Sequence, residues 1–168
     1  MTDARSSKAF PSPEHDHGRC LQQTLARAVS SFEALGLRLT PLRRRVLEEI
    51  AGSHHAIGAY EILERLARKG GARLAPISVY RTLDVLLEAG IVHRLESRNA
   101  FFACHAPHSG DRRQIVLACE RCGEVAEVPG EPVFDGIAGA ARKVGFVPSR
   151  SVVEVTGACG RCSVSAGS

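Results

Sequence analysis

The sequence has no long apolar run near its beginning. Residues 1–19 read MTDARSSKAFPSPEHDHGR, which is polar and contains several prolines and serines. A secretory signal or a membrane anchor needs a continuous apolar stretch, so we expect neither here. We expect instead a flexible arm over residues 1–19 and a cytoplasmic protein whose thiols stay reduced.

Net charge is also scarce, at a formal +4, and it is unevenly distributed. Residues 1–103 carry 15 Lys and Arg against 11 Asp and Glu, whereas residues 104–168 carry seven of each. A surplus confined to the first part is expected if only that part touches a polyanion, although such a small excess is also common in proteins that never meet nucleic acid. With 168 residues, 44% of them hydrophobic, the chain has room for one or two small domains.

The N-terminal part predicts four helices. They cover residues 20–35, residues 41–51 with Thr40 as N-cap and Pro41 at the first position, residues 59–69, and residues 78–89 with Ser78 as N-cap. In the third helix we expect Tyr60, Leu63, Leu66 and Ala67 to face inward. Two β-rich segments follow, residues 91–97 and 100–104, separated by a short turn. Helices followed by a β-hairpin predict a winged helix-turn-helix domain over residues 20–103.

The fourth helix has the pattern of a DNA-reading helix. Val79, Leu83, Leu86 and Leu87 recur at helical spacing and face the core, which turns Tyr80 and Arg81 outward. An arginine there is able to bond a guanine edge, and Tyr80 a phosphate; the alternative is an ordinary solvated helix start. The basic run Arg43–Arg45 is likewise either a phosphate contact or a solvated face.

After a hinge over residues 104–113, the pattern changes to a small α/β domain over residues 114–163. It is expected to hold strands over residues 114–119, 124–128 and 151–159 and a helix over 133–145. A domain of that size has only marginal stability unless a metal ion or disulfide cross-links it or a partner covers it.

Two cysteine pairs are able to supply that cross-link. Cys119 and Cys122, then Cys159 and Cys162, are each separated by two residues, and two such turns close a tetrahedral four-thiolate zinc site. A thioredoxin-like redox pair is the competing interpretation. It needs one pair at a helix start in a βαβ unit, whereas strand-like residues follow the first pair and the second pair lies almost at the end of the sequence.

The remaining cysteines and histidines are more ambiguous. Cys104, with His93, His105 or His108, and Glu127 from the next domain, has the composition of a second zinc site; the alternative is a polar linker with incidental histidines. Cys20 is expected to be a buried small residue. His54 and His55 suggest an accessory metal site or, more simply, loop histidines.

Longer segments resemble the ferric uptake regulator (Fur) superfamily. They are LTPLRRRVLEEI, ISVYRTLDVLLEAGIVHRLES and CERCGEV. AFFACH and VEVTGACGRC make the chain most similar to the zinc uptake regulator (Zur) branch. The resemblance covers about residues 20–162. It implies an α+β protein with an N-terminal winged helix-turn-helix domain and a small α/β dimerisation domain, which is not an enzyme and takes no small-molecule substrate.

The resemblance also implies partners and sites. It implies a homodimer that, loaded with zinc, binds pseudo-palindromic double-stranded operator DNA and silences zinc-uptake genes. The ligands it implies for one structural zinc per subunit are Cys119, Cys122, Cys159 and Cys162. For one regulatory zinc they are His93, Cys104, Glu127 and His108, with His105 as the alternative to His108. The residues assigned to DNA binding are Tyr80, Arg81, Ser78, Arg43 and Arg44. Iron sensing is the nearest alternative, but a thiolate at Cys104 favours zinc; a CxxC redox protein or a metal store is more distant.

Overall fold

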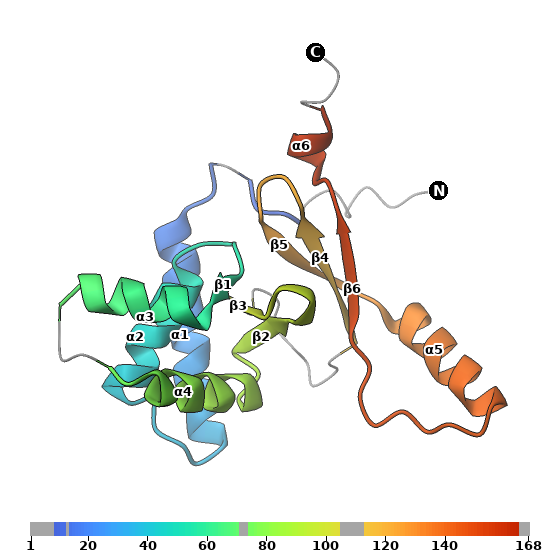
Figure 1. Cartoon of the computed structure of the whole chain (residues 1–168), viewed down its shortest axis with the longest axis horizontal. Coiled ribbons are helices and arrows are strands. Elements are labelled where there is room, and N and C mark those ends of the chain that lie inside the picture. Colours follow the sequence, from blue (N-terminus) through green and yellow to red (C-terminus); the bar gives the residue numbers. More distant parts are fainter. Residues whose placement is uncertain (1–8, 13, 71–73, 105–112, 165–168) are drawn as a thin grey trace. The chain divides into compact units, whose positions relative to one another are not determined.

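A computed structural model describes residues 9–12, 14–70, 74–104 and 113–164 of the chain (Figure 1). It divides into two compact units, one of Pro11–His105 and another whose described residues are 9–10 and 113–164. No helix within the described ranges is both long and apolar enough to cross a membrane. Each unit contains one three-stranded sheet.

The N-terminal unit begins with four helices, which are α1 (His17–Ala34), α2 (Pro41–Ala51), α3 (Ala59–Arg68) and α4 (Pro76–Glu88). The Thr40 hydroxyl caps α2 by accepting from the backbone N–H of Arg43 (3.3 Å), as the sequence predicts. Gly36 and Gly90, directly beyond α1 and α4, both have a positive φ, which glycine adopts without the steric cost of a Cβ. The start of α2 and the ends of α1 and α4 therefore follow from local capping chemistry.

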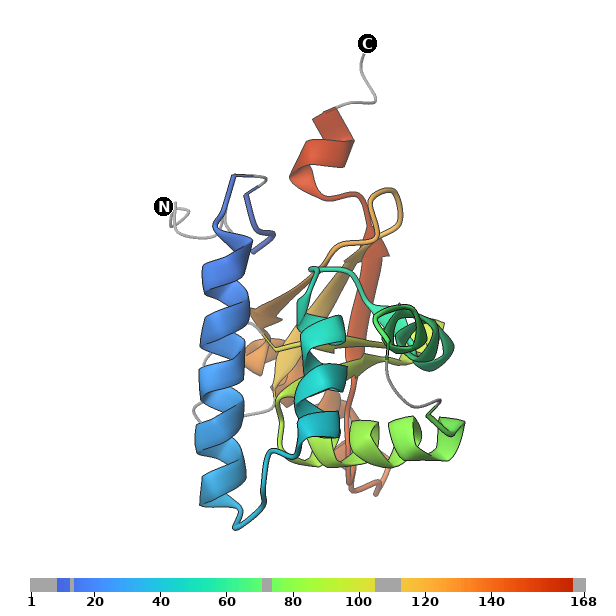
Figure 2. The same cartoon turned by 90° about the vertical axis from the view of Figure 1, so that its left-hand side faces the viewer.

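Apolar faces of all four helices meet in one core. Figure 2 shows the helices of this unit from a second direction. Phe32 of α1, Ile50 of α2, Ile62 of α3 and Leu83 of α4 are each at most 1% exposed. Burying such side chains stabilises the unit by about 1.5–3 kcal/mol each. The core holds the outward face of α4 in a fixed orientation.

The wing is a three-stranded antiparallel sheet in the order β1-β3-β2. Its strands are β1 (Ile57–Gly58), β2 (Val92–Leu95) and β3 (Ala100–Ala103). Between β2 and β3 the chain makes one 3-10 turn over Glu96–Arg98 and passes through Asn99 at φ 47°, a conformation that asparagine tolerates better than most residues. The winged helix-turn-helix architecture is thus present.

The C-terminal unit is a three-stranded sheet with two helices. β4 (Gln114–Cys119) is central, with β5 (Val125–Pro129) antiparallel on one side and β6 (Val153–Gly157) parallel on the other. The parallel pair requires a long crossover, and α5 (Glu131–Lys143) forms part of it. A short helix, α6 (Gly160–Val164), follows β6. This is the α+β class expected from the sequence.

Several local predictions were wrong. α1 begins at His17, so residues 17–19 of the segment predicted to be a flexible arm are helical; Asp16 accepts from the N–H of Arg19 and caps the helix. α4 begins at Pro76 with Ala75 as N-cap, so Ser78 lies inside the helix. Proline is favoured at a first helical position because its missing N–H would have no partner there.

The inward face of α3 was also misassigned. Tyr60 is 70% exposed and Ala67 is exposed, whereas Ile62 and Leu66 are buried and Leu63 packs against the core. Strand β1 and helix α6 were not predicted, because two residues and five residues are too short for a periodic signal.

Candidate metal centre and nucleic-acid interface

The two cysteine pairs meet at one end of the C-terminal sheet. β4 ends at Cys119, and the chain turns back through Gly123, whose N–H donates to the Cys119 carbonyl (3.0 Å) and whose φ is 77°. β6 runs parallel to β4 with Gly157 in register with Cys119. The chain therefore delivers the second pair, Cys159 and Cys162, beside the first.

The four sulfur atoms form a compact group, called here the four-cysteine cluster. All four lie within 4.8 Å of one another, and the Sγ atoms of Cys122 and Cys159 are 3.7 Å apart. A disulfide requires roughly 2.0 Å. Sulfurs on a tetrahedral zinc, with Zn–S of roughly 2.3 Å, lie about 3.8 Å apart. The spacing fits a four-thiolate metal site.

Backbone N–H groups inside the cluster favour the thiolate form of one cysteine, Cys119. N–H groups of Cys122 and Cys159 lower the pKa of Cys119 to about 6, and the Cys159 N–H lies 3.3 Å from the Cys119 sulfur. Desolvation raises the pKa of Cys162 to about 12, and the neighbouring thiols add to that rise. Further thiolates therefore need a cation beside them, which is the electrostatic requirement of a bound metal ion.

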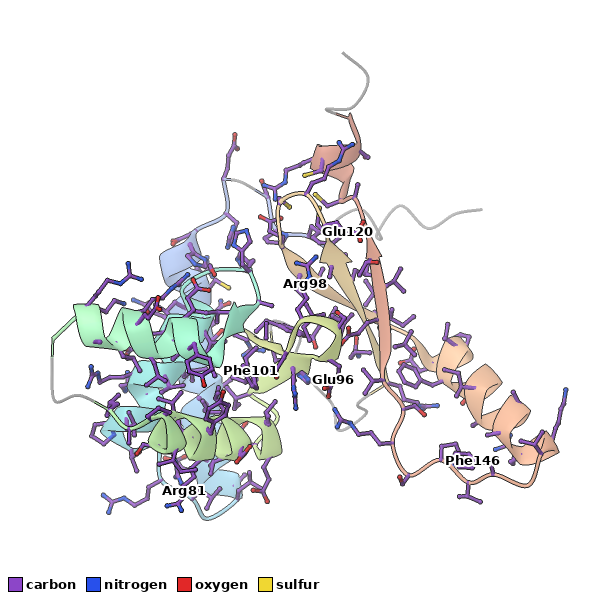
Figure 3. The ribbon with its side chains drawn as sticks, in the orientation of Figure 1. Arg81, Glu96, Arg98, Phe101, Glu120 and Phe146 are labelled. Carbon is purple, nitrogen blue, oxygen red and sulfur yellow. The ribbon has the colours of Figure 1, made fainter. Side chains whose placement is uncertain are left out.

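Two arginines hold α6 against the β4–β5 turn. Arg161 forms an ion pair with Glu124, and the Arg121 guanidinium donates to the Cys162 carbonyl. Together they fix the segment that carries the second cysteine pair. Figure 3 shows Glu120 in the same turn.

Residues predicted for a second metal site are divided between the two units. In the N-terminal unit, β2 carries His93, Cys104 follows β3, and ligand atoms of these two residues lie within 4.8 Å of one another. Arg27 of α1 donates to the Cys104 carbonyl (2.6 Å) and fixes the backbone there. Glu127 lies on β5, opposite Val116 of β4. His105 and His108 lie outside the described residues.

The predicted DNA-reading residues lie on the outer face of α4. Tyr80 is 36% exposed and Arg81 is exposed, whereas Val79 and Leu83 beside them are buried. Figure 3 shows Arg81 projecting from α4 away from the helices of its unit. Ser78 is half-buried, and its carbonyl accepts from the buried Thr82 hydroxyl (2.8 Å). Tyr80 and Arg81 are therefore free to meet a ligand, and Ser78 is less so.

The basic run on α2 is partly engaged by the protein itself. The Arg43 guanidinium donates to the Arg38 carbonyl (2.6 Å) and lies 5.5 Å from the centre of the Phe32 ring. Arg44 pairs with Glu48 (3.7 Å) on the exposed surface, a type of pair worth little in water. Arg44 is thus the freer of the two to contact a phosphate.

A further group of metal-ligating residues was found only in part from the sequence, which named His54 with His55 for an accessory metal site but neither His15 nor Cys20. His15, Cys20 and His54 lie together in the N-terminal unit. No motif links them, because Cys20 and His54 are 34 positions apart in the sequence, and Cys20 was expected to be only a buried small residue. Cys20 is partly exposed.

A family model named ferric uptake regulator family matches residues 34–156. The chain belongs to this family. One relative, the zinc uptake regulation protein of Escherichia coli (strain K12), is 38% identical over 141 residues, which cover 84% of this chain and 82% of the relative. Another relative, the peroxide operon regulator of Bacillus subtilis (strain 168), is 29% identical over 141 residues, which cover 83% of this chain and 93% of the relative.

Two solved structures are similar to this fold. A zinc uptake regulator complexed with zinc and DNA matches with a TM-score of 0.81 at 36% identity, covering 88% of this chain and 98% of that one. The crystal structure of holo XcZur matches with a TM-score of 0.75 at 37% identity, covering 86% and 99%. The family resemblance and the fold class expected from the sequence are confirmed.

Proposed function

We propose that this family member is a zinc-responsive transcriptional repressor, which binds operator DNA as a zinc-loaded homodimer and silences zinc-uptake genes. The observation that carries the proposal is the close structural match to a zinc uptake regulator complexed with zinc and DNA. The four-cysteine cluster offers sulfur ligands for zinc, and the exposed face of α4 offers side chains for DNA.

One zinc ion is structural in this proposal. Its ligands are Cys119, Cys122, Cys159 and Cys162, whose sulfurs have the spacing that zinc requires. Zinc there supplies the positive charge that four neighbouring thiolates need, and it joins the ends of β4 and β6. Because four thiolates close a tetrahedral ion, this site has no open position for substrate and serves stability.

A second zinc ion is regulatory in this proposal. His93 and Cys104 of the N-terminal unit bind it together with Glu127 of the C-terminal unit, and His108 completes the site with His105 in reserve. The nearness of His93 to Cys104 supports this assignment. A thiolate ligand favours zinc over Fe(II), and one thiolate with one carboxylate balances the two charges of the ion.

Operator binding is assigned to α4 and the start of α2. Tyr80 and Arg81 face outward from a helix whose other side is locked into the core, the arrangement that a helix in the major groove requires. Arg81 reads a base, Tyr80 and Ser78 support it, and Arg43 and Arg44 lie against phosphates. In this scheme the DNA is double-stranded and the protein acts in the cytoplasm.

Dimerisation is assigned to the C-terminal unit. β6 is an edge strand of its sheet, and exposed edges pair readily with another chain. Large apolar side chains also lie exposed on this unit, namely Val133, Ile137, Val144, Phe146, Val147, Val152 and Val155; Figure 3 labels Phe146, between α5 and β6. A second copy of the chain covers these side chains in a two-fold dimer, which matches a pseudo-palindromic operator.

The proposal is tested by titrating operator binding with Zn(II), Fe(II), Mn(II) and Ni(II) under reducing conditions. We expect Zn(II) to raise affinity for the operator at the lowest free-metal concentration. A stronger response to Fe(II) would make the protein an iron regulator. No metal response, together with a reversible disulfide in the four-cysteine cluster, would make it a thiol redox protein.

A further inference from the structure

Three potential ligands converge where α1 begins. His15 precedes α1, Cys20 lies in its first turns, and His54 lies in the turn after α2; their ligand atoms are all within 4.8 Å of one another. All three belong to the N-terminal unit, and none contributes to the two metal sites proposed above. We call this group the His15–Cys20–His54 cluster.

Local hydrogen bonds place these residues. The Asp16 carboxylate caps α1, and the Asp16 carbonyl accepts the first helical bond, from the N–H of Cys20 (3.1 Å). His15 and Cys20 are thereby held on either side of the cap. The His17 Nε2 donates to the Gly52 carbonyl (2.7 Å), which ties the start of α1 to the turn that carries His54.

Hydrogen bonding also fixes the tautomer of His15. Its Nδ1 lies 2.9 Å from the Ser12 carbonyl oxygen, and a carbonyl only accepts, so this nitrogen carries the proton. The lone pair is therefore on Nε2, the atom that faces His54. A ring N–H bonded to a backbone carbonyl is the usual outer support of a metal-binding histidine.

The two imidazoles already face each other with ring nitrogens at short range. The Nε2 atoms of His15 and His54 are 2.7 Å apart, as in an N–H···N hydrogen bond. Two nitrogens on a tetrahedral zinc, with Zn–N of roughly 2.0–2.1 Å, lie about 3.3 Å apart. The rings need to separate by only about half an ångström to admit the ion.

His17 lies beside the cluster and has a buried ring nitrogen without a hydrogen-bond partner among the described residues. Its ring centre lies 5.0 Å from that of His54 and 5.5 Å from that of His15. Because its Nε2 donates to Gly52, its Nδ1 carries a lone pair, and that buried atom has no hydrogen-bond partner among the described residues. Three protein ligands leave one position of a tetrahedral ion for this nitrogen or for water.

We propose that His15, Cys20 and His54 form a third zinc-binding site, which joins the start of α1 to the turn after α2. Two imidazoles and one thiolate suit a borderline-soft divalent ion and not Mg²⁺ or Ca²⁺, which prefer oxygen ligands. The site adds to the metal sites of the proposed function and does not depend on them.

The test compares metal content and cobalt spectra of full-length variants. Wild type, Cys20→Ser, His54→Gln and His55→Gln are titrated with zinc, and bound metal is counted after gel filtration. His55 is the matched control, since it is exposed, adjacent in sequence and outside the cluster. Loss of Cys20 or His54 is expected to remove one exchangeable ion per subunit, with its affinity falling by more than the roughly 10- to 100-fold that an outer-shell change costs. His55→Gln is expected to match wild type.

Co(II) then reports the donor set. Wild type loaded with Co(II) is expected to show thiolate-to-cobalt absorption. In Cys20→Ser this absorption should fall by the part that the Cys20 thiolate contributes. If Cys20→Ser fails to fold, His15→Gln decides, because His15 precedes the helix and lies outside the core cluster. Equal metal content in wild type, His15→Gln and His54→Gln would overturn the proposal and leave His15–His54 as a hydrogen bond only. Loss of the zinc response on operator DNA, with this ion retained, would instead count against the proposed function alone.

Discussion

The sulfur atoms of Cys122 and Cys159 lie 3.7 Å apart, although the two residues are 37 positions apart in the sequence. The distance is too long for a disulfide of about 2.0 Å and close to the sulfur–sulfur edge of a tetrahedral zinc site. The fold brings the atoms together by placing β6 parallel to β4. In this chain the sheet brings the four cysteines together, and loss of the cluster should loosen the sheet.

Cys119→Ser should damage the C-terminal unit. Losing a structural zinc removes folding free energy on the order of 10 kcal/mol in small zinc domains, and the Cys119 sulfur also accepts the N–H of Cys159. We expect loss of one tightly held zinc per subunit and a large drop in the thermal midpoint, measured by metal analysis and calorimetry. His55→Gln removes an exposed ligand-type side chain outside all three proposed metal sites and is the control; it should keep this zinc and the wild-type thermal midpoint. A Cys119→Ser protein as stable as wild type would show that the cluster is not structural.

Arg81→Ala should weaken specific operator binding by about 1–3 kcal/mol, because a bidentate arginine–guanine contact is worth that much in discrimination. Non-specific binding should change much less. Fluorescence anisotropy on operator and random DNA at one salt concentration measures both. Arg142→Ala removes the same charge from α5 in the C-terminal unit and should leave both affinities unchanged. Equal losses on both DNAs would reassign Arg81 to a phosphate.

Val155→Lys should weaken the dimer. Val155 lies on the edge strand β6 and is 49% exposed, so the subunit loses little when it is replaced. In a dimer paired along β6, two buried lysines would each need desolvation without a partner. Sedimentation at micromolar concentration with zinc should show a monomer. Val29→Lys, on α1 and 36% exposed, is the control and should remain dimeric.

Much of the fold could be predicted because local chemistry determined it. Thr40 and Pro41 mark the start of α2, and the apolar run IVLAC that follows Gln114 predicts a strand over residues 114–119, the bounds of β4. The start of α4 was misplaced by two residues because Ser78 is a good cap by type, whereas Pro76 claims the first position. Tyr60 was placed inside because it is large and partly apolar, yet Ile62 occupies the inward position of α3.

The sites divide in the same way. The four-cysteine cluster could be predicted because each pair is a local motif, and only the return of β6 had to be inferred. The His15–Cys20–His54 cluster could not be predicted, because its closeness depends on how the start of α1 lies against the turn after α2. Contacts of that kind come from tertiary packing and leave no spacing in the sequence.

Cys104→Ser should separate sensing from folding. The chain should stay folded and keep the zinc of the four-cysteine cluster, since Cys104 lies in the other unit. It should lose one exchangeable zinc and the zinc-dependent gain in operator affinity. The reason is linkage, because zinc favours DNA binding only by the amount that it binds the DNA-competent arrangement more tightly than others.

Glu127→Gln offers the matching test from the C-terminal unit. If one ion takes ligands from both units, this variant should lose the same exchangeable zinc and shift the zinc-response curve in the same direction as Cys104→Ser. The double variant should then lose little more zinc-dependent operator affinity than either single variant, since each change removes the same ion. The measurement is operator binding against buffered free zinc for the four proteins. A wild-type response in Cys104→Ser would place the sensor elsewhere, and additive shifts would assign Cys104 and Glu127 to separate effects.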